Sequence, residues 1–202
     1  MKYKRIGMFT ILILIITVSS ACNNKALEDM DFSETAVVKV DNSPIFLNEL
    51  MYHVTLAKLQ GQLYASFLKD TDFWNKEYAK GVTMGDVMKQ EAMDNAIKYE
   101  LLYRRAVDES YSLTEEEIAS CASKVESIRK TLSKEEIEMM DLTEEELLVL
   151  QKKIALSTRY YNDYFSSNNI DDETAYKEMI KGHKIKINQK VWKQVKFGEI
   201  KK

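Results

Sequence analysis

The sequence predicts a mostly α-helical fold closed by a small antiparallel sheet. Between residues 48 and 180, apolar side chains recur at helical spacing in long stretches, and Ser/Thr-x-x-Glu motifs mark several helix starts. Two short segments rich in β-branched residues lie near the ends of the chain, at residues 37–40 and 184–187. Because a short strand is unstable by itself in water, we expect these two segments to pair. An all-helical bundle with frayed ends is the alternative.

The beginning of the chain has the features of a secretory signal. Three basic side chains within the first five residues precede an uncharged apolar run at residues 6–18, and small residues then lead to Cys22. This order predicts a signal peptide over residues 1–21. The small residues before the cysteine resemble a bacterial lipobox, with Ser19 where that motif prefers leucine. We therefore expect Cys22 to be lipidated and to become the mature N-terminus. A plain signal peptide or an uncleaved anchor is the alternative.

The predicted mature protein consists of a tether, residues 22–35, and one domain, residues 36–202. The tether is polar and acidic without periodicity, so we expect it to link the lipid to the first strand. Residues 41–44, Asp-Asn-Ser-Pro, have the chemistry of a turn after that strand. Asn48 is then the expected N-cap of a first helix, which the apolar spacing extends to Leu68.

Further signals divide the helical middle of the chain. Residues 69–80 break the helical pattern, and Thr83 with Asp86 starts a long helix of about 25 residues. We expect shorter helices joined by tight turns after it, about six helices in all. Their starts are marked by Thr114 with Glu117, Ser133 with Glu136, Thr143 with Glu146, and Asp171-Asp172 before a last helix to Ile180.

Composition and charge exclude some partners. Residues 1–21 carry three basic groups, and without them 26 basic and 32 acidic residues remain, a net charge of −6. This balance argues against a nucleic-acid partner. The charge is segregated, with a net of −7 over residues 113–150 and +7 over residues 177–202. The basic end could contact anionic lipid near the anchor, or it is a solvated strand face.

Signals for catalysis or for metal binding are weak. His53 and His183 are the two histidines, and neither has cysteine or carboxylate partners at ligand spacing, so we expect no metal site. The six glycines form no phosphate-binding loop, and we expect no cofactor. His53 is more typical of a core or partly exposed side chain than of a general base, so we predict no catalytic residue. Cys121 has apolar neighbours at helical spacing and is expected to be buried.

Soft and aromatic side chains are abundant instead. Eleven tyrosines, ten methionines, seven phenylalanines and two tryptophans suit an adaptable binding surface, although each of them is also a candidate core residue. We expect the first long helix to form one wall of an apolar groove. Two aromatic residues after it are candidates for a partly exposed rim, with burial of Trp74 in the core as the favoured alternative. The candidates are Tyr52, Leu56, Leu63, Tyr64 and Phe67 on the wall, with Phe73 and Trp74 at the rim.

Several of these motifs together resemble SurA-type and PrsA-type extracytoplasmic chaperones. The first match is the valine strand followed by Asp41-Asn42, Ile45 and Glu49, with Ser43 where the family usually has glycine. The later matches are the Phe73-Trp74 loop, the helix starts at residues 81–83, 112–117 and 169–173, and the motif at residues 99–106. In this order the motifs span most of residues 36–180.

The resemblance implies a helical chaperone body that binds unfolded exported polypeptides without ATP. Lipid on Cys22 would anchor it at the outer face of the bacterial cytoplasmic membrane, or on the periplasmic side. The family often carries a parvulin-type prolyl isomerase domain after its last motif, but residues 173–184 are too few to hold one. Two alternatives stay open: a peptidyl-prolyl isomerase with an unrecognised site, and an adaptor lipoprotein for one membrane partner.

Overall fold

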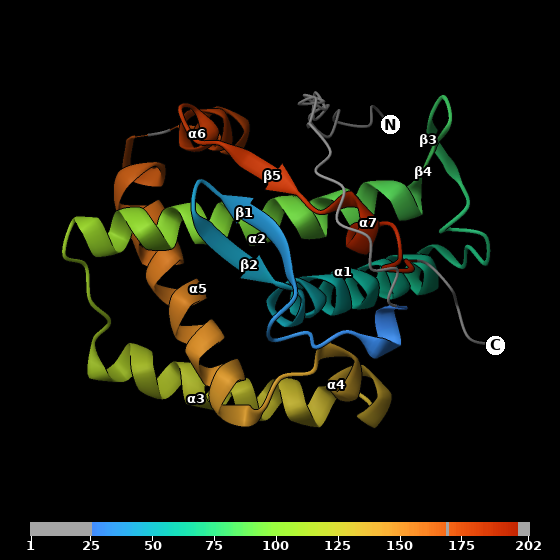
Figure 1. Cartoon of the computed structure of the whole chain (residues 1–202), viewed down its shortest axis with the longest axis horizontal. Helices are drawn as coiled ribbons and strands as arrows, with labels where there is room; N and C mark the ends of the chain where they lie inside the picture. Colours follow the sequence, from blue (N-terminus) through green and yellow to red (C-terminus); the bar gives the residue numbers. More distant parts are fainter. Residues whose placement is uncertain (1–25, 169, 198–202) are drawn as a thin grey trace.

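The computed structural model describes residues 26–168 and 170–197, and it is mostly helical, as predicted (Figure 1). Cys22 and the signal segment lie outside the described residues. The helices are α1 (Leu47–Leu68), α2 (Met84–Asp108), α3 (Glu115–Thr131), α4 (Lys134–Met140), α5 (Glu144–Tyr164), α6 (Asp172–Ile180) and α7 (Gln189–Trp192). The strands are β1 (Ala36–Val40), β2 (Ser43–Phe46), β3 (Glu77–Ala79), β4 (Val82–Thr83) and β5 (Ile185–Ile187).

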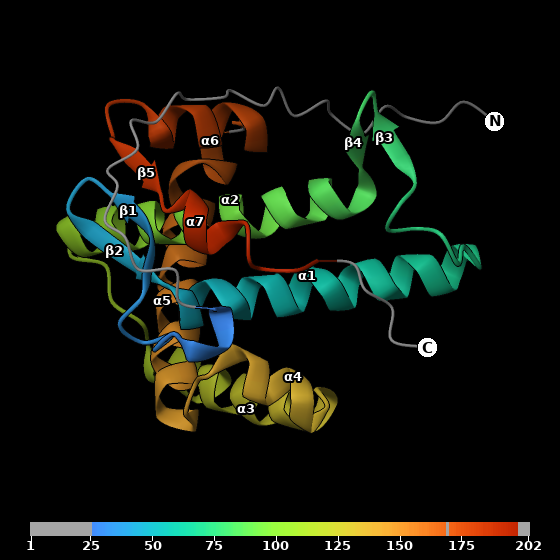
Figure 2. The same cartoon turned by 45° about the vertical axis from the view of Figure 1, so that its right-hand side comes forward.

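The two ends of the described chain meet in one small sheet with the strand order β2-β1-β5. Strand β5 lies antiparallel to β1, with Val38 opposite Ile187 and Val40 opposite Ile185. The predicted pairing of these two segments is therefore confirmed. It closes the long helical middle of the chain into one body, because the sheet lies beside α2 in both views (Figure 1, Figure 2).

The predicted turn at residues 41–44 is wrong in its second half. Asp41 and Asn42 turn the chain, with Asp41 in the left-handed region at φ 55°, which short polar residues tolerate. Ser43 and Pro44 already belong to β2, which forms a hairpin with β1. Strand β2 is at the edge of the sheet, so Pro44 can lie opposite Lys39 although it has no N–H to donate.

The Asp41 carboxylate joins this hairpin to the C-terminal strand. Its Oδ1 accepts the backbone N–H of Lys184 at 2.8 Å, and its Oδ2 lies 2.8 Å from Nδ1 of His183. Arg104 of α2 donates to the same carboxylate and to the Val40 carbonyl, each at 3.3 Å. The hydrogen bond with His183, followed by that from the Lys184 backbone, lowers the pKa of Asp41 to about 2.

Helix α1 begins at Leu47, one residue before the predicted cap. Phe46 is the N-cap residue and makes no side-chain cap hydrogen bond, so the prediction of Asn48 as N-cap is wrong. The first-turn donors are used by an earlier segment of backbone instead. The N–H of Leu47 donates to the carbonyl of Thr35, and the N–H of Asn48 donates to the carbonyl of Phe32.

The segment that supplies these carbonyls is not a free tether in its described part, residues 26–35. Leu27, Met30 and Phe32 are partly buried against the main core, and a 3₁₀ turn spans Leu27–Asp29. These residues therefore pack on the domain, and their role as a link from the lipid to the first strand stays a prediction. Their apolar side chains gain more by covering the core than by staying in water.

The other helix starts agree with the predictions. Complete capping boxes are present at Thr83 with Asp86, Thr114 with Glu117, Ser133 with Glu136 and Thr143 with Glu146, and Asp171 caps α6. Helices α1, α2 and α5 pack around the main core, while α3 and α4 enclose a second cluster of buried side chains against α5 and α1. Cys121 is buried on α3, as predicted. Of the helices within the described ranges, none is both long and apolar enough to cross a membrane.

Candidate polypeptide-binding surface

The far end of α1 exposes four large apolar side chains. Leu63 is 70 % exposed, Tyr64 50 %, Phe67 86 % and Leu68 58 %. Residues four apart on a helix lie on the same side, so the pairs Leu63 with Phe67 and Tyr64 with Leu68 form one continuous face. We call these four residues the α1 tip. A contiguous apolar face that water can reach is typical of an interaction site.

This exposure follows from the arrangement of the helices. The first half of α1 is covered by α2 and by the pair of helices α3 and α4, whereas its second half extends past α4 (Figure 2). The opposite side of that second half is still buried, because Gly61 and Ala65 face the core. Strand β3 lies at the same end of the molecule and exposes about half of Tyr78.

The polar surroundings of the α1 tip place few constraints on a ligand. The four side chains carry no charge, and the Tyr64 hydroxyl accepts a hydrogen bond from Nε2 of Gln60 at 3.4 Å. Helix α1 then ends at Lys69, which takes the left-handed conformation at φ 52°. Contacts to such a surface would depend mainly on apolar area and little on direction.

The remaining binding candidates are covered by other parts of the fold. Tyr52 is buried, and its hydroxyl accepts a hydrogen bond from Nε2 of Gln151 at 2.8 Å. Leu56 is partly buried against the second cluster. Phe73 and Trp74 are only 4 % and 5 % exposed, so the rim placement is wrong and the alternative, burial of Trp74 in the core, is confirmed. The structure brings together three of the predicted residues, Leu63, Tyr64 and Phe67, and adds Leu68, whose apolar side chain follows the same spacing.

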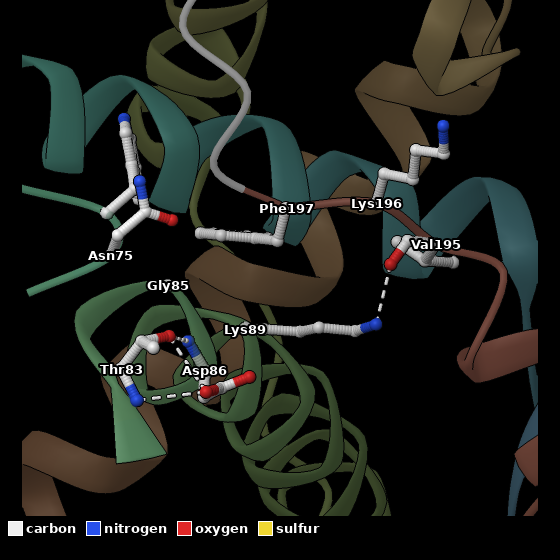
Figure 3. A pocket seen from close by; sticks show the side chains of 9 residues that line it. Asn75, Thr83, Gly85, Asp86, Lys89, Val195, Lys196 and Phe197 are labelled. Carbon is white, nitrogen blue, oxygen red and sulfur yellow. Dashed lines mark hydrogen bonds between the residues drawn. The ribbon is translucent and has the colours of Figure 1, made fainter. Parts of the chain in front are cut away.

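A cavity of about 370 Å³ lies beside Trp74, between the start of α2 and residues 195–197 (Figure 3). Lys89 crosses it, and its Nζ donates to the carbonyls of Trp192 at 3.0 Å and of Val195 at 2.6 Å. Burial lowers the pKa of Lys89. Thr83 and Asp86 bond each other in the helix cap. The two bonds from Lys89 fasten the C-terminal segment to α2.

A buried charged cluster formed by Lys153, Glu49 and Glu100 has no local signal in the sequence. Nζ of Lys153 lies 2.6 Å from a carboxylate oxygen of Glu49 and 2.6 Å from one of Glu100, and all three side chains are less than one-fifth exposed. Burial alone would lower the pKa of Lys153, but the two carboxylates raise it, so the ammonium group keeps its proton. The one indirect sign of the cluster in the sequence is that Glu49 and Glu100 each belong to a motif that resembles the chaperone family.

The two histidines have different surroundings. His53 is 5 % exposed and lies between the rings of Tyr52 and Tyr99, and burial lowers its pKa to about 3. Its Nε2 is buried without a hydrogen-bond partner among the described residues. His183 is held by Asp41. In the described part of the chain, no three metal-binding side chains gather at one point.

Comparison with known proteins adds no relative that would assign a role to the α1 tip. The resemblance to SurA-type and PrsA-type chaperones therefore remains a prediction from the motifs. No protein-family model matches the chain, and no curated protein or solved structure matches it either.

Proposed function

We propose that this protein is a lipid-anchored extracytoplasmic chaperone that holds unfolded exported polypeptides without ATP. The observation that carries the proposal is the α1 tip, a helical face with four exposed apolar side chains. The signal segment and Cys22 support it, because they would place this face outside the cytoplasmic membrane, where exported chains emerge unfolded. The order of the chaperone-like motifs along residues 36–180 supports it further.

The expected affinity suits reversible holding. Covering one large apolar side chain contributes about 1.5–3 kcal/mol. Association of two molecules costs about 4 kcal/mol or more, and ordering an unfolded segment adds to that cost. Four side chains therefore leave only a weak net affinity, so a client is released without an energy source.

An aggregation assay on an unfolded client, without nucleotide, tests this function. We expect the wild-type protein to delay aggregation and the double variant Leu63→Ala/Phe67→Ala to lose most of that effect. Both side chains are largely exposed and alanine favours helix, so the variant should keep its circular dichroism spectrum. Val107→Ala is the matched control, because Val107 is an exposed apolar residue of α2 outside the α1 tip.

Two results would contradict the proposal. One is a wild-type protein that is folded but neither delays aggregation nor binds unfolded chains. The other is a double variant that protects the client as well as the wild type. Trp74→Ala serves a different purpose, since it removes a buried ring and should destabilise the fold itself.

The alternatives predict other outcomes. An isomerase would accelerate proline isomerisation in a short peptide and lose that activity in His53→Ala, but the enclosed position of His53 gives this function no support. A pull-down from native membranes would recover one stoichiometric partner if the protein is an adaptor, and many clients if it is a chaperone.

A further inference from the structure

A second surface feature lies between the start of α1 and the first turns of α5, and we call it the α1–α5 groove. Its volume is about 330 Å³, and Leu142, Val149 and Leu150 give it apolar walls. Leu150 is buried, whereas Val149 is 62 % exposed and belongs to neither core cluster of the described residues. Part of this apolar wall is therefore open to solvent.

The charge of the groove is negative at its base and at its rim. At the base, Glu49 and Lys153 line the groove, and the single ammonium group of Lys153 also pairs with Glu100, which does not line it. The two carboxylates outnumber the one ammonium group, so one negative charge is in surplus. At the rim lie Glu145 and Glu146, and Glu146 is already used in the cap of α5. Glu145 forms no hydrogen bond or ion pair with the residues that the structure describes.

We propose that the α1–α5 groove binds a lysine or arginine side chain carried by an apolar polypeptide segment. The aliphatic stem would lie along Leu142 and Val149, and the cationic head would reach Glu145 and the surplus charge at Glu49. Charge complementarity selects this occupant, because the groove repels an acidic segment and attracts a basic one. The net charge of −7 over residues 113–150 would also attract basic segments from a distance.

This site is separate from the α1 tip and does not depend on the proposed function. From Glu49 to Phe67 the helix advances 18 residues, about 27 Å at the rise of an α-helix. The volume of the groove suits one long side chain and its immediate neighbours, at the small end of ligand pockets. The groove would therefore select for basic character, whereas the α1 tip accepts apolar segments in general.

Fluorescence anisotropy with short labelled peptides tests the site, using the full chain in nanodiscs of zwitterionic lipid. The probe peptide alternates lysine with leucine, and two comparison peptides replace the lysines by glutamate or the leucines by serine. We expect both comparison peptides to bind more weakly than the probe. Glu145→Lys should weaken binding of the probe about tenfold, because it replaces attraction by repulsion at the rim. Val149→Ser should also weaken it, through loss of the exposed apolar wall.

Glu135→Lys is the matched control. Glu135 is also exposed and is also the second residue of a capped helix, on α4 in the same acidic region, but it does not line the groove. This variant should change the Kd of the probe peptide by less than about twofold, because an exposed charge outside the binding site interacts only weakly with the peptide. Equal losses in Glu135→Lys and Glu145→Lys would overturn the proposal, because net charge would then explain binding. Tight binding of the glutamate peptide would overturn it too. So would a result in which Phe67→Ala abolishes binding of the probe peptide while Glu145→Lys leaves it unchanged.

Discussion

The indole ring of Trp74 lies directly against Gly61 of α1. A Cβ atom on residue 61 would stand 2.1 Å from Cη2 of the ring, far inside van der Waals contact. The ring also contacts Phe73 and Phe197 edge to face, at centroid distances of 5.3 and 5.5 Å. Glycine is unfavourable inside a helix. At position 61, however, the missing side chain leaves room for the Trp74 ring, so the connection after α1 can fold back onto that helix.

Gly61→Ala should therefore destabilise the protein, which reverses the usual effect. In an exposed helix interior, alanine is favoured over glycine by about 1 kcal/mol. Here the added methyl group must displace an enclosed ring, and overpacking a core costs about 1–3 kcal/mol. Urea unfolding should show a lower midpoint. In the double variant Gly61→Ala/Trp74→Leu the two losses should be less than additive, and a stabilised Gly61→Ala protein would refute this explanation.

Lys153→Met should cost about 3 kcal/mol of unfolding free energy, because Glu49 and Glu100 would be left without their shared cation in a nearly buried site. Burial already raises the pKa of Glu49. Lys177→Met is the control, since it breaks an exposed pair with Glu173 and should cost less than about 0.5 kcal/mol. Similar losses in the two variants would show that the buried cluster contributes no more than a surface pair.

The stability contributed by Asp41 should depend on pH in the acid range. Its pKa is about 2 in the folded protein against an ordinary value of 3.8, so folding favours the charged carboxylate. This contribution is complete above the ordinary pKa and is lost as the pH falls through the folded one. Asp41→Asn should thus unfold at lower urea than the wild type at neutral pH, and the difference should shrink between about pH 4 and pH 2. A difference that stays constant over this range would rule out the linkage.

Labelling of cells with a fatty-acid analogue tests the anchor. We expect the wild-type protein to take up the label and to fractionate with membranes, and Cys22→Ala to do neither. One acyl chain binds a membrane only marginally, so stable anchoring should need more than one chain. If wild type and Cys22→Ala behave alike, the lipobox prediction is wrong.

The helix starts were predictable because their signals are local. Each capping box joins two residues three positions apart, such as Thr114 and Glu117, so the hydrogen bonds form within a single turn. The pairing of β1 with β5 was predictable for a different reason. Two short β-branched segments near the ends of the chain each needed a partner, and pairing them satisfied both.

Only the tertiary structure decided which aromatic side chains reach the surface. Phe67 and Trp74 are seven positions apart, and each has one apolar and one polar neighbour along the chain, yet Phe67 is 86 % exposed and Trp74 is 5 % exposed. In the same way, no local spacing could join Lys153 to Glu49, which is 104 residues away. The physical reason is that capping depends on neighbours along the chain, whereas burial and ion pairing depend on which distant surfaces the packed helices bring together.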